Sequence, residues 1–341
     1  MKIIVTGSFK YSIYAPAFAS GFASLGHLVE SVHEEDYLSW ESRLGKLYEK
    51  IQVRTRIGYK VVRYNKELLS KVETFKPDMV FLYRCYFVWP STIKKIQEQG
   101  TKVFSYNNDD PFSKVLNNWE HRYFHASIPI VDVNLVYRKK NILDFKKAGA
   151  KEVELMLPYY LEKENSYEKI PDTIPIAFIG HFEDDGRDQY IKALMDAGLQ
   201  VSIYDSGWQK SSLYKELRPV MKPAVYSSQY NHELNKCQIA LVFLSKLNCD
   251  TYTRRCFEIP ATKTLMLSEY TDDLNALFPD NECAVYFRTK EELVERCREL
   301  LSTPQRIAQI AENGYKRVHE IGGSEVDRCR QITELYQKLF N

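Results

Sequence analysis

Four polar side chains near residue 250 have the types and the spacing that could bind a diphosphate and a neighbouring ribose. The segment CDTYTRRCFEIPATKTLMLSEY places Asp250, the adjacent Arg254 and Arg255, and Glu258 directly before an apolar run. A helix that begins here would present free backbone N–H groups, and guanidinium groups in its first turns suit phosphate oxygens. Glu258 could accept hydrogen bonds from two adjacent ribose hydroxyls. The alternative is that Arg254 and Glu258, four residues apart, simply pair on a helix surface.

A second polar run, YNNDDPF, follows an expected strand in the first half of the chain and contains Asp109 and Asp110. A carboxylate at the end of a strand could bind substrate hydroxyls or act as a base, so Asp110 is a catalytic candidate. The alternative is a turn and a helix cap, because Asp before Pro favours turn initiation. His121 and His125 are spaced for one helix face, but no third ligand accompanies them. The sequence therefore predicts no metal site.

The elements that must position these residues alternate between short apolar runs and helical patterns. Such alternation predicts βαβ units with parallel sheets. Strands are expected at 2–9, 78–84, 102–108, 131–138, 174–180, 199–207, 237–244, 263–269 and 283–289. Helices are expected at 14–29, 90–100, 187–198, 231–237, 254–261, 290–302, 304–321 and 324–340.

Composition supports a packed globular protein and excludes several classes. The 341 residues suffice for two domains, 44% are hydrophobic, and the formal net charge of +2 gives no sign of nucleic-acid binding. No apolar run is long enough to cross a bilayer, and the N-terminus does not resemble a signal peptide. Seven scattered cysteines without a CxxC pair favour reduced thiols and a cytoplasmic location.

The block around residue 250 resembles the E-x7-E pattern of retaining glycosyltransferases with the GT-B fold. Asp250 and Glu258 occupy the two acidic positions. The longer run RCFEIPATKTLMLSEYTDDLNALFPDNECAVYFRTKEELVERC is more similar still to the CgeB-like glycosyltransferases, and the similarity extends over roughly residues 174 to 335. Two positions depart from the pattern: Asp250 is shorter than Glu, and Lys263 stands where the family has glycine.

The resemblance implies an α/β protein of GT-B fold, with two Rossmann-like doubly wound domains facing a central cleft. An acceptor-binding domain is expected at 1–160, a linker at 161–172 and a nucleotide-sugar-binding domain at 173–318. A last helix, 319–341, is expected to pack back on the first domain.

The family comparison adds candidate donor-binding residues in two turns of the second domain. The turn IGHFEDDGR would lie against the donor diphosphate, and YDSGW resembles a family turn that could form part of the base pocket. A solvated helix start is the alternative for Arg187, and a packing role is the alternative for Trp208. The donor-binding candidates are Gly180, His181, Arg187, Ser206, Gly207, Trp208, Arg254, Arg255, Glu258 and Lys263.

The sequence as a whole predicts a glycosyltransferase that moves a sugar from a nucleoside-diphosphate sugar to a glycan or protein acceptor, with retention implied by the resemblance. Asp250, Arg255 and Asp110 are the expected catalytic residues. No cofactor or metal is expected beyond the donor, and a homodimer is possible. The alternatives are a nucleotide-sugar epimerase or hydrolase of the same fold, and a non-catalytic nucleotide-sugar-binding assembly protein.

Overall fold

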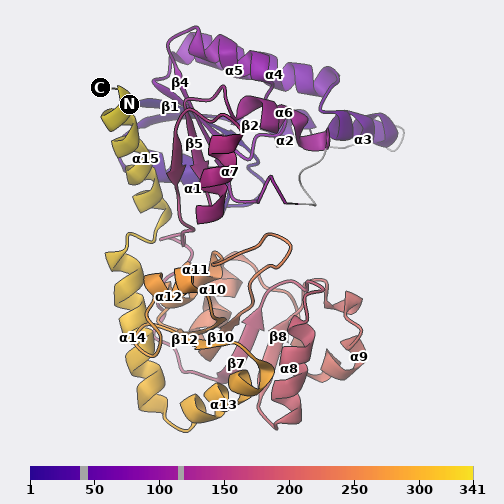
Figure 1. Ribbon diagram of the computed structural model, residues 1–341, viewed down its shortest axis with the longest axis vertical. Helices are drawn as coiled ribbons and strands as arrows, with labels where there is room; N and C mark the ends of the chain where they lie inside the picture. The colour runs from indigo at the N-terminus through magenta and orange to yellow at the C-terminus, as the bar shows by residue number, and fades with distance from the viewer. Residues whose placement is uncertain (39–44, 114–118, 341) are drawn as a thin grey trace. The chain divides into compact units, whose positions relative to one another are not determined.

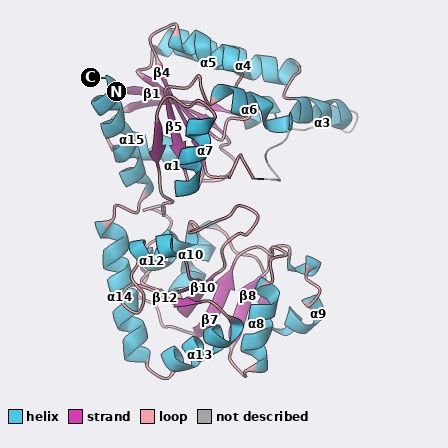
Figure 2. Cartoon of the chain, in the orientation of Figure 1, coloured by secondary structure: helices cyan, strands magenta, loops and turns pink. Residues whose placement is uncertain are grey.

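The computed structural model describes residues 1–38, 45–113 and 119–340, which divide into two compact units (Figure 1). The first unit contains Met1–Leu157 and the helix that begins at Glu325, and the second contains Pro158–Ser324. Each unit is built around its own six-stranded sheet, with helices surrounding the strands (Figure 2). The prediction of an α/β protein is confirmed.

The sheet of the first unit has the strand order β2-β1-β3-β4-β5-β6, and its neighbouring strands run parallel. β1 and β3 are buried along nearly their whole length, as expected where helices cover both faces of a parallel sheet. Its strands are β1 (Lys2–Gly7), β2 (Leu28–His33), β3 (Met79–Tyr83), β4 (Lys102–Asn107), β5 (Val133–Val136) and β6 (Val153–Leu155).

Helices connect these strands, and the last helix of the chain, α15, contacts the first one, α1. Gly21 makes that contact close, because a Cβ there would lie 2.6 Å from Sγ of Cys329. The helices are α1 (Ala15–Ser24), α2 (Glu35–Leu38), α3 (Gly45–Thr55), α4 (Tyr59–Phe75), α5 (Pro90–Gln97), η1 (Trp119–His121), α6 (Arg122–Ser127), α7 (Lys139–Lys147) and α15 (Glu325–Phe340).

The sheet of the second unit has the strand order β12-β11-β10-β7-β8-β9, again with parallel neighbours. The chain first adds strands on one side of β7 and then on the other, so the order reverses between β7 and β10. Its strands are β7 (Ile174–Ile179), β8 (Val201–Tyr204), β9 (Met221–Lys222), β10 (Cys237–Val242), β11 (Leu265–Glu269) and β12 (Val285–Phe287).

Right-handed crossovers in opposite directions place the helices that follow β7 and β10 on opposite faces of this sheet. α8 packs beside α13, whereas α11 packs beside α14 (Figure 1). The helices are α8 (Arg187–Asp196), η2 (Trp208–Lys210), α9 (Tyr214–Leu217), η3 (Arg218–Val220), α10 (Ser227–Asn235), α11 (Arg255–Ala261), α12 (Asp272–Leu277), α13 (Lys290–Leu301) and α14 (Pro304–Glu320).

The expected helix at 14–29 is wrong in its second half. α1 ends at Ser24, Gly26 adopts a left-handed conformation with φ of 82°, and β2 begins at Leu28. Glycine accepts that conformation without the steric cost that a side chain brings, so it ends the helix here. The strand was missed because Leu28 is exposed and the residues between it and Val32 are only half-buried, which hides the apolar pattern of a sheet strand.

The segment expected as a linker, 161–172, contains no helix or strand but is anchored on the second unit. Asn231 of α10 accepts a hydrogen bond from the backbone N–H of Ser166 at 3.0 Å and donates to the side chain of Glu168 at 2.7 Å. Asn235 accepts from the backbone N–H of Glu168 at 2.6 Å. This segment therefore belongs to the second unit, and Asn231 serves to hold it.

Candidate functional site

The turn after β7 and the start of α11 meet where the strand order of the second sheet reverses. Gly180 directly follows β7, and Arg255 begins the helix that follows β10 and its loop. β7 and β10 are neighbours, so these two positions lie at the carboxyl edge of adjacent strands. Doubly wound sheets bind their ligands at this place, because the loops diverge there and leave room.

Arg255 is fixed against that turn by one end of its guanidinium group. Its Nε atom donates to the carbonyl oxygen of Ile179 at 2.7 Å. A Cβ on Gly180 would lie 2.6 Å from Nη2 of Arg255, so a larger residue there would require the guanidinium group to move. Within residues 1–38, 45–113 and 119–340, neither terminal amino group of Arg255 has a hydrogen-bond or ion-pair partner. The half-buried arginine therefore presents donors that suit phosphate oxygens.

The neighbouring Arg254 has a different partner. Its Nε atom donates to Oε1 of Glu258 at 2.5 Å, and its guanidinium carbon lies 5.5 Å from the centre of the Tyr159 ring. Burial opposes the charge of Arg254, but the Glu258 carboxylate raises its pKa above the ordinary value. This is the i,i+4 pair that the spacing allowed, although it is largely buried rather than on an open helix surface.

Glu258 is held from a second side by a residue that the sequence did not single out. The hydroxyl of Tyr230, in α10, donates to Oε2 of Glu258 at 2.8 Å. Burial and the nearby carboxylate raise the pKa of Tyr230 well above its ordinary value, so the phenol keeps its proton and donates. Tyr230 lies 28 residues before Glu258 in another helix, and no local pattern marks the pair.

Arg187 is buried and orders the loop that it follows. Its Nε and Nη2 atoms donate to the two oxygens of Asp185 at 2.8 and 2.6 Å, and Nη1 donates to the carbonyl oxygen of His181 at 2.8 Å. Only 3% of its surface is exposed, so it lacks the open donors of Arg255. His181 is exposed and contacts Glu183 at 2.9 Å, which lowers the pKa of that carboxyl to about 2.

The YDSGW turn packs against the turn that contains Gly180. Trp208 is fully buried, with Nε1 donating to the carbonyl oxygen of Gly180 at 3.0 Å and its ring near those of Phe178 and Phe182. The turn itself is set by Gly207, with φ of 80°, and by Ser206, whose carbonyl accepts from the N–H of Phe182 at 2.9 Å. This burial agrees with the packing role for Trp208, which fixes the Gly180 turn.

Lys263 lies beyond the opposite end of α11 from Arg255. Its Nζ atom pairs with Glu312 of α14 at 2.8 Å and lies near the rings of Tyr167 and Tyr315. Its backbone is left-handed, with φ of 55°, which explains why glycine suits this position after a helix. The backbone conformation, rather than contact with a ligand, gives a sufficient physical reason for the glycine of the family pattern.

The two remaining catalytic candidates occupy different surroundings. Asp250 is half-buried in the loop before α11, and its backbone N–H donates to the carbonyl oxygen of Ser245 at 2.9 Å. Asp110, in the first unit, is fully buried. Its carboxylate accepts from the backbone N–H of Phe112 at 3.1 Å and from Nδ2 of Asn141 at 2.9 Å, and it pairs with Lys140 at 2.6 Å. These contacts match the turn in the alternative for Asp110, while no helix begins in the described residues 111–113.

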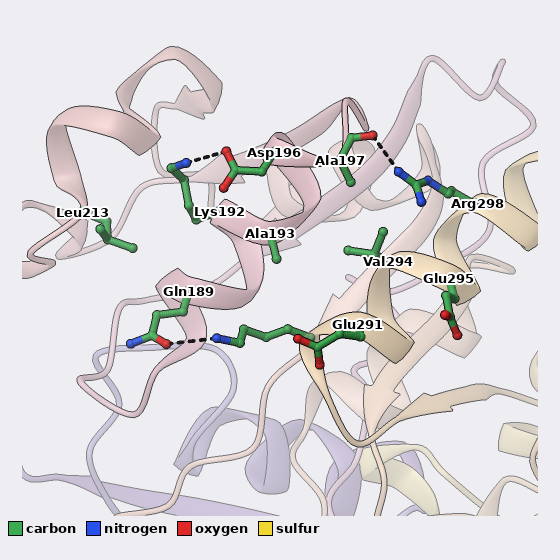
Figure 3. A pocket seen from close by; sticks show the side chains of 11 residues that line it. Gln189, Lys192, Ala193, Asp196, Ala197, Leu213, Glu291, Val294, Glu295 and Arg298 are labelled. Carbon is green, nitrogen blue, oxygen red and sulfur yellow. Dashed lines mark hydrogen bonds and ion pairs between the residues drawn. The ribbon is translucent and has the colours of Figure 1, made fainter.

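A groove of about 640 Å³ lies between α8 and α13, outside the residues just described (Figure 3). Its walls carry both signs of charge. Lys192 pairs with Asp196 within α8, and Arg298 of α13 donates to the carbonyl oxygen of Ala197 at the end of α8. None of its lining residues is a candidate of the sequence analysis. The described residues also contain no cluster of His, Cys, Asp and Glu with metal-binding geometry. No helix among them is long and apolar enough to span a bilayer.

Comparison with known proteins agrees with this arrangement. Residues 187–323 match the model of a family described as glycosyl transferase-like, which includes Arg255 and Glu258. The search of curated proteins finds no match.

Solved structures resemble the whole chain. Sucrose-phosphate synthase from Thermosynechococcus elongatus has a TM-score of 0.67 at 12% identity, covering 100% of this chain and 99% of that one. HepE from Anabaena, solved with UDP and glucose, has a TM-score of 0.68 at 11% identity, covering 99% and 100%. A glycosyltransferase from Rickettsia africae has a TM-score of 0.65 at 13% identity, covering 99% and 97%.

At these identities the solved structures establish the fold, and the family match covers most of the second unit. The predictions of a GT-B fold and of a glycosyltransferase are confirmed at this level, whereas membership of the CgeB-like group stays a prediction. The chain has the GT-B fold, and residues 187–323 of its second unit match a family described as glycosyl transferase-like.

Proposed function

We propose that this protein transfers a sugar from a nucleoside-diphosphate sugar to a hydroxyl of a glycan or protein acceptor. The observation that carries the proposal is the position of Arg255 beside Gly180, where the strand order of the second sheet reverses. A diphosphate against Gly180 would receive hydrogen bonds from the terminal amino groups of Arg255. These bonds strengthen as charge develops on the departing diphosphate, which is how a fixed cation speeds bond cleavage.

The other residues have roles that follow from their places around Arg255. Glu258 would accept hydrogen bonds from the donor ribose, and Asp250, in the loop before α11, would lie near the donor sugar. Arg254 would hold Glu258, while Arg187 and Trp208 would keep the 180–187 turn in shape. Arg187, Trp208 and Lys263 are therefore supporting residues in this proposal, and Asp110 is a structural residue of the first unit.

The chemistry is one exchange of bonds at the anomeric carbon. The bond from that carbon to the diphosphate oxygen breaks, a bond to the acceptor oxygen forms, and the proton of the acceptor hydroxyl passes to the departing diphosphate. We propose that the first unit binds the acceptor, that configuration is retained as the resemblance implies, and that no metal takes part. All seven cysteines are free thiols, which supports a reducing compartment such as the cytoplasm.

A thermal-shift screen against UDP, GDP, dTDP, CMP and ADP tests the donor site directly. UDP is the first choice, since HepE of the same fold was solved with it. A stabilising shift with one nucleotide, lost in Arg255→Ala and in Glu258→Ala, is expected. If none of the nucleotides raises the unfolding temperature, the proposal is contradicted.

Incubation with the matching nucleotide sugar then separates transfer from its alternatives. Release of nucleoside diphosphate that depends on an added acceptor is the expected result. Release of free or isomerised sugar without acceptor would favour a hydrolase or epimerase. Binding without turnover across a broad acceptor panel would favour an assembly protein.

A further inference from the structure

The carboxylate of Glu258 is oriented by two hydrogen bonds that come from different helices. Arg254, one turn earlier in the sequence, reaches Oε1 at 2.5 Å, and Tyr230 of α10 reaches Oε2 at 2.8 Å. The residue itself is 7% exposed. One donor on each oxygen fixes the plane of the carboxylate, because rotation about its last bond would break both contacts.

This arrangement leaves the Glu258 carboxylate able to accept further hydrogen bonds. An ionised carboxylate can accept roughly four hydrogen bonds, two on each oxygen. Arg254 and Tyr230 use one position on each oxygen. Among the residues that the structure describes, no other side chain donates to this carboxylate, so acceptor capacity remains on both Oε1 and Oε2. Two hydroxyls on neighbouring carbons present two O–H donors, one for each oxygen.

We propose that Tyr230 is a positioning residue that sets Glu258 to read both ribose hydroxyls, so that the site selects ribonucleoside diphosphates over their 2′-deoxy counterparts. The inference rests on the proposed function, since it assigns the donor ribose to Glu258. A 2′-deoxy donor leaves one oxygen of a buried carboxylate without its second hydrogen bond, and such an unmade bond to a charged group is costly.

Tyr230, more than Arg254, determines this selection. Arg254 directly precedes α11, the helix that contains Glu258, and can follow its movements, whereas Tyr230 holds the carboxylate from α10. Removal of its hydroxyl leaves Glu258 held from one side and free to turn.

Isothermal titration calorimetry of the full chain with three matched pairs tests the inference. The pairs are UDP and 2′-deoxy-UDP, GDP and 2′-deoxy-GDP, and ADP and 2′-deoxy-ADP. For the base that binds, the wild-type protein is expected to prefer the ribonucleotide by about tenfold. In Tyr230→Phe the preference falls to about threefold or less, because affinity for the ribonucleotide drops while affinity for the 2′-deoxy form hardly changes.

Tyr190→Phe is the matched control, since it removes a tyrosine hydroxyl of the same unit that contacts the carbonyl oxygen of Arg288 at 3.5 Å. It should keep the tenfold preference. A purely structural role of Tyr230 would weaken both members of a pair equally and leave the ratio unchanged, which would overturn the inference. Equal affinity of the wild-type protein for both members would overturn it as well, with the proposed function intact. Failure of every nucleotide to bind, both in these pairs and in the thermal-shift screen, would overturn both.

Discussion

The Nε atom of Arg255 donates to the carbonyl oxygen of Ile179 at 2.7 Å, which joins the start of α11 to the end of β7. This bond uses the Nε edge of the guanidinium group and leaves Nη2 beside the Gly180 turn. The same fork geometry that would bind a diphosphate is thus fixed before any ligand arrives, which lowers the cost of ordering it.

Gly180→Ala should weaken nucleoside-diphosphate binding about tenfold. The added methyl group would lie 2.6 Å from Nη2 of Arg255 and 2.8 Å from Cζ of Phe178, so the guanidinium group must leave its seat. Calorimetry with the nucleotide that binds gives the loss, which corresponds to about 1.4 kcal/mol. The double variant Gly180→Ala with Arg255→Ala should be little worse than Arg255→Ala alone. Additive losses would show that Gly180 acts independently of Arg255.

Glu258→Ala should lower the free energy of unfolding by about 2–3 kcal/mol, because it leaves the largely buried Arg254 without its carboxylate. Urea unfolding, followed by circular dichroism, measures the change. The surface pair of Lys192 and Asp196 provides the control, and Lys192→Ala should leave the free energy of unfolding nearly unchanged. Equal losses in the two variants would mean that Glu258 forms an ordinary surface pair.

Lys263→Gly should leave nucleotide affinity within about twofold of the wild-type value, because the Lys263 side chain is engaged with Glu312. Relief of the left-handed backbone, at φ of 55°, favours glycine by about 1 kcal/mol, and the lost surface pair offsets part of this. Calorimetry and thermal unfolding of the same samples give both quantities. A large loss of affinity would place Lys263 in the donor site after all.

The Glu34→Gln variant should gain stability relative to the wild-type protein as pH rises. Burial and the nearby Glu35 raise the pKa of Glu34 to about 7, although Arg56 and Arg84 oppose the shift. The protonated folded form is thus favoured below the unfolded pKa of about 4.5, and that contribution is lost as pH rises through 7. Glutamine cannot ionise, so it escapes this loss.

Urea unfolding at pH 4.5 and pH 8 measures this effect for Glu34→Gln and for the exposed control Glu98→Gln. The advantage of Glu34→Gln over the wild-type protein should grow by about 1–2 kcal/mol between the two pH values, and that of the control should not change. The same advantage at both pH values would contradict a raised pKa.

Much of the fold follows from local sequence patterns, whereas the site depends on contacts between distant segments. Buried strands such as β7 and β10 appear as apolar runs, and α11 was expected within one residue of its start. The half-exposed β2 lacks such a run and was missed. The spacing of Arg254 and Glu258 allows their pair, but it says nothing of Tyr230.

The sequence also does not tell which of the three arginines of the site keeps donors for a ligand. Arg187 is saturated by Asp185 and the carbonyl oxygen of His181, and Arg254 pairs with Glu258. Arg255 keeps open donors because the strand end supplies only one acceptor to it. These differences arise from tertiary packing, and sequence spacing cannot reveal them.

The most direct test of the diphosphate site measures ligand affinity by calorimetry in the wild-type protein, Arg255→Ala and Arg298→Ala. UDP is compared with uridine, and each of the other diphosphates with its nucleoside. Arg298 lies at the groove between α8 and α13 and serves as the charge-matched control. Arg255→Ala should weaken diphosphate binding by about 10- to 100-fold and leave nucleoside binding unchanged, while Arg298→Ala should bind both as the wild-type protein does. Equal diphosphate affinity in Arg255→Ala and wild-type protein would contradict the assignment of the diphosphate to the Arg255 seat.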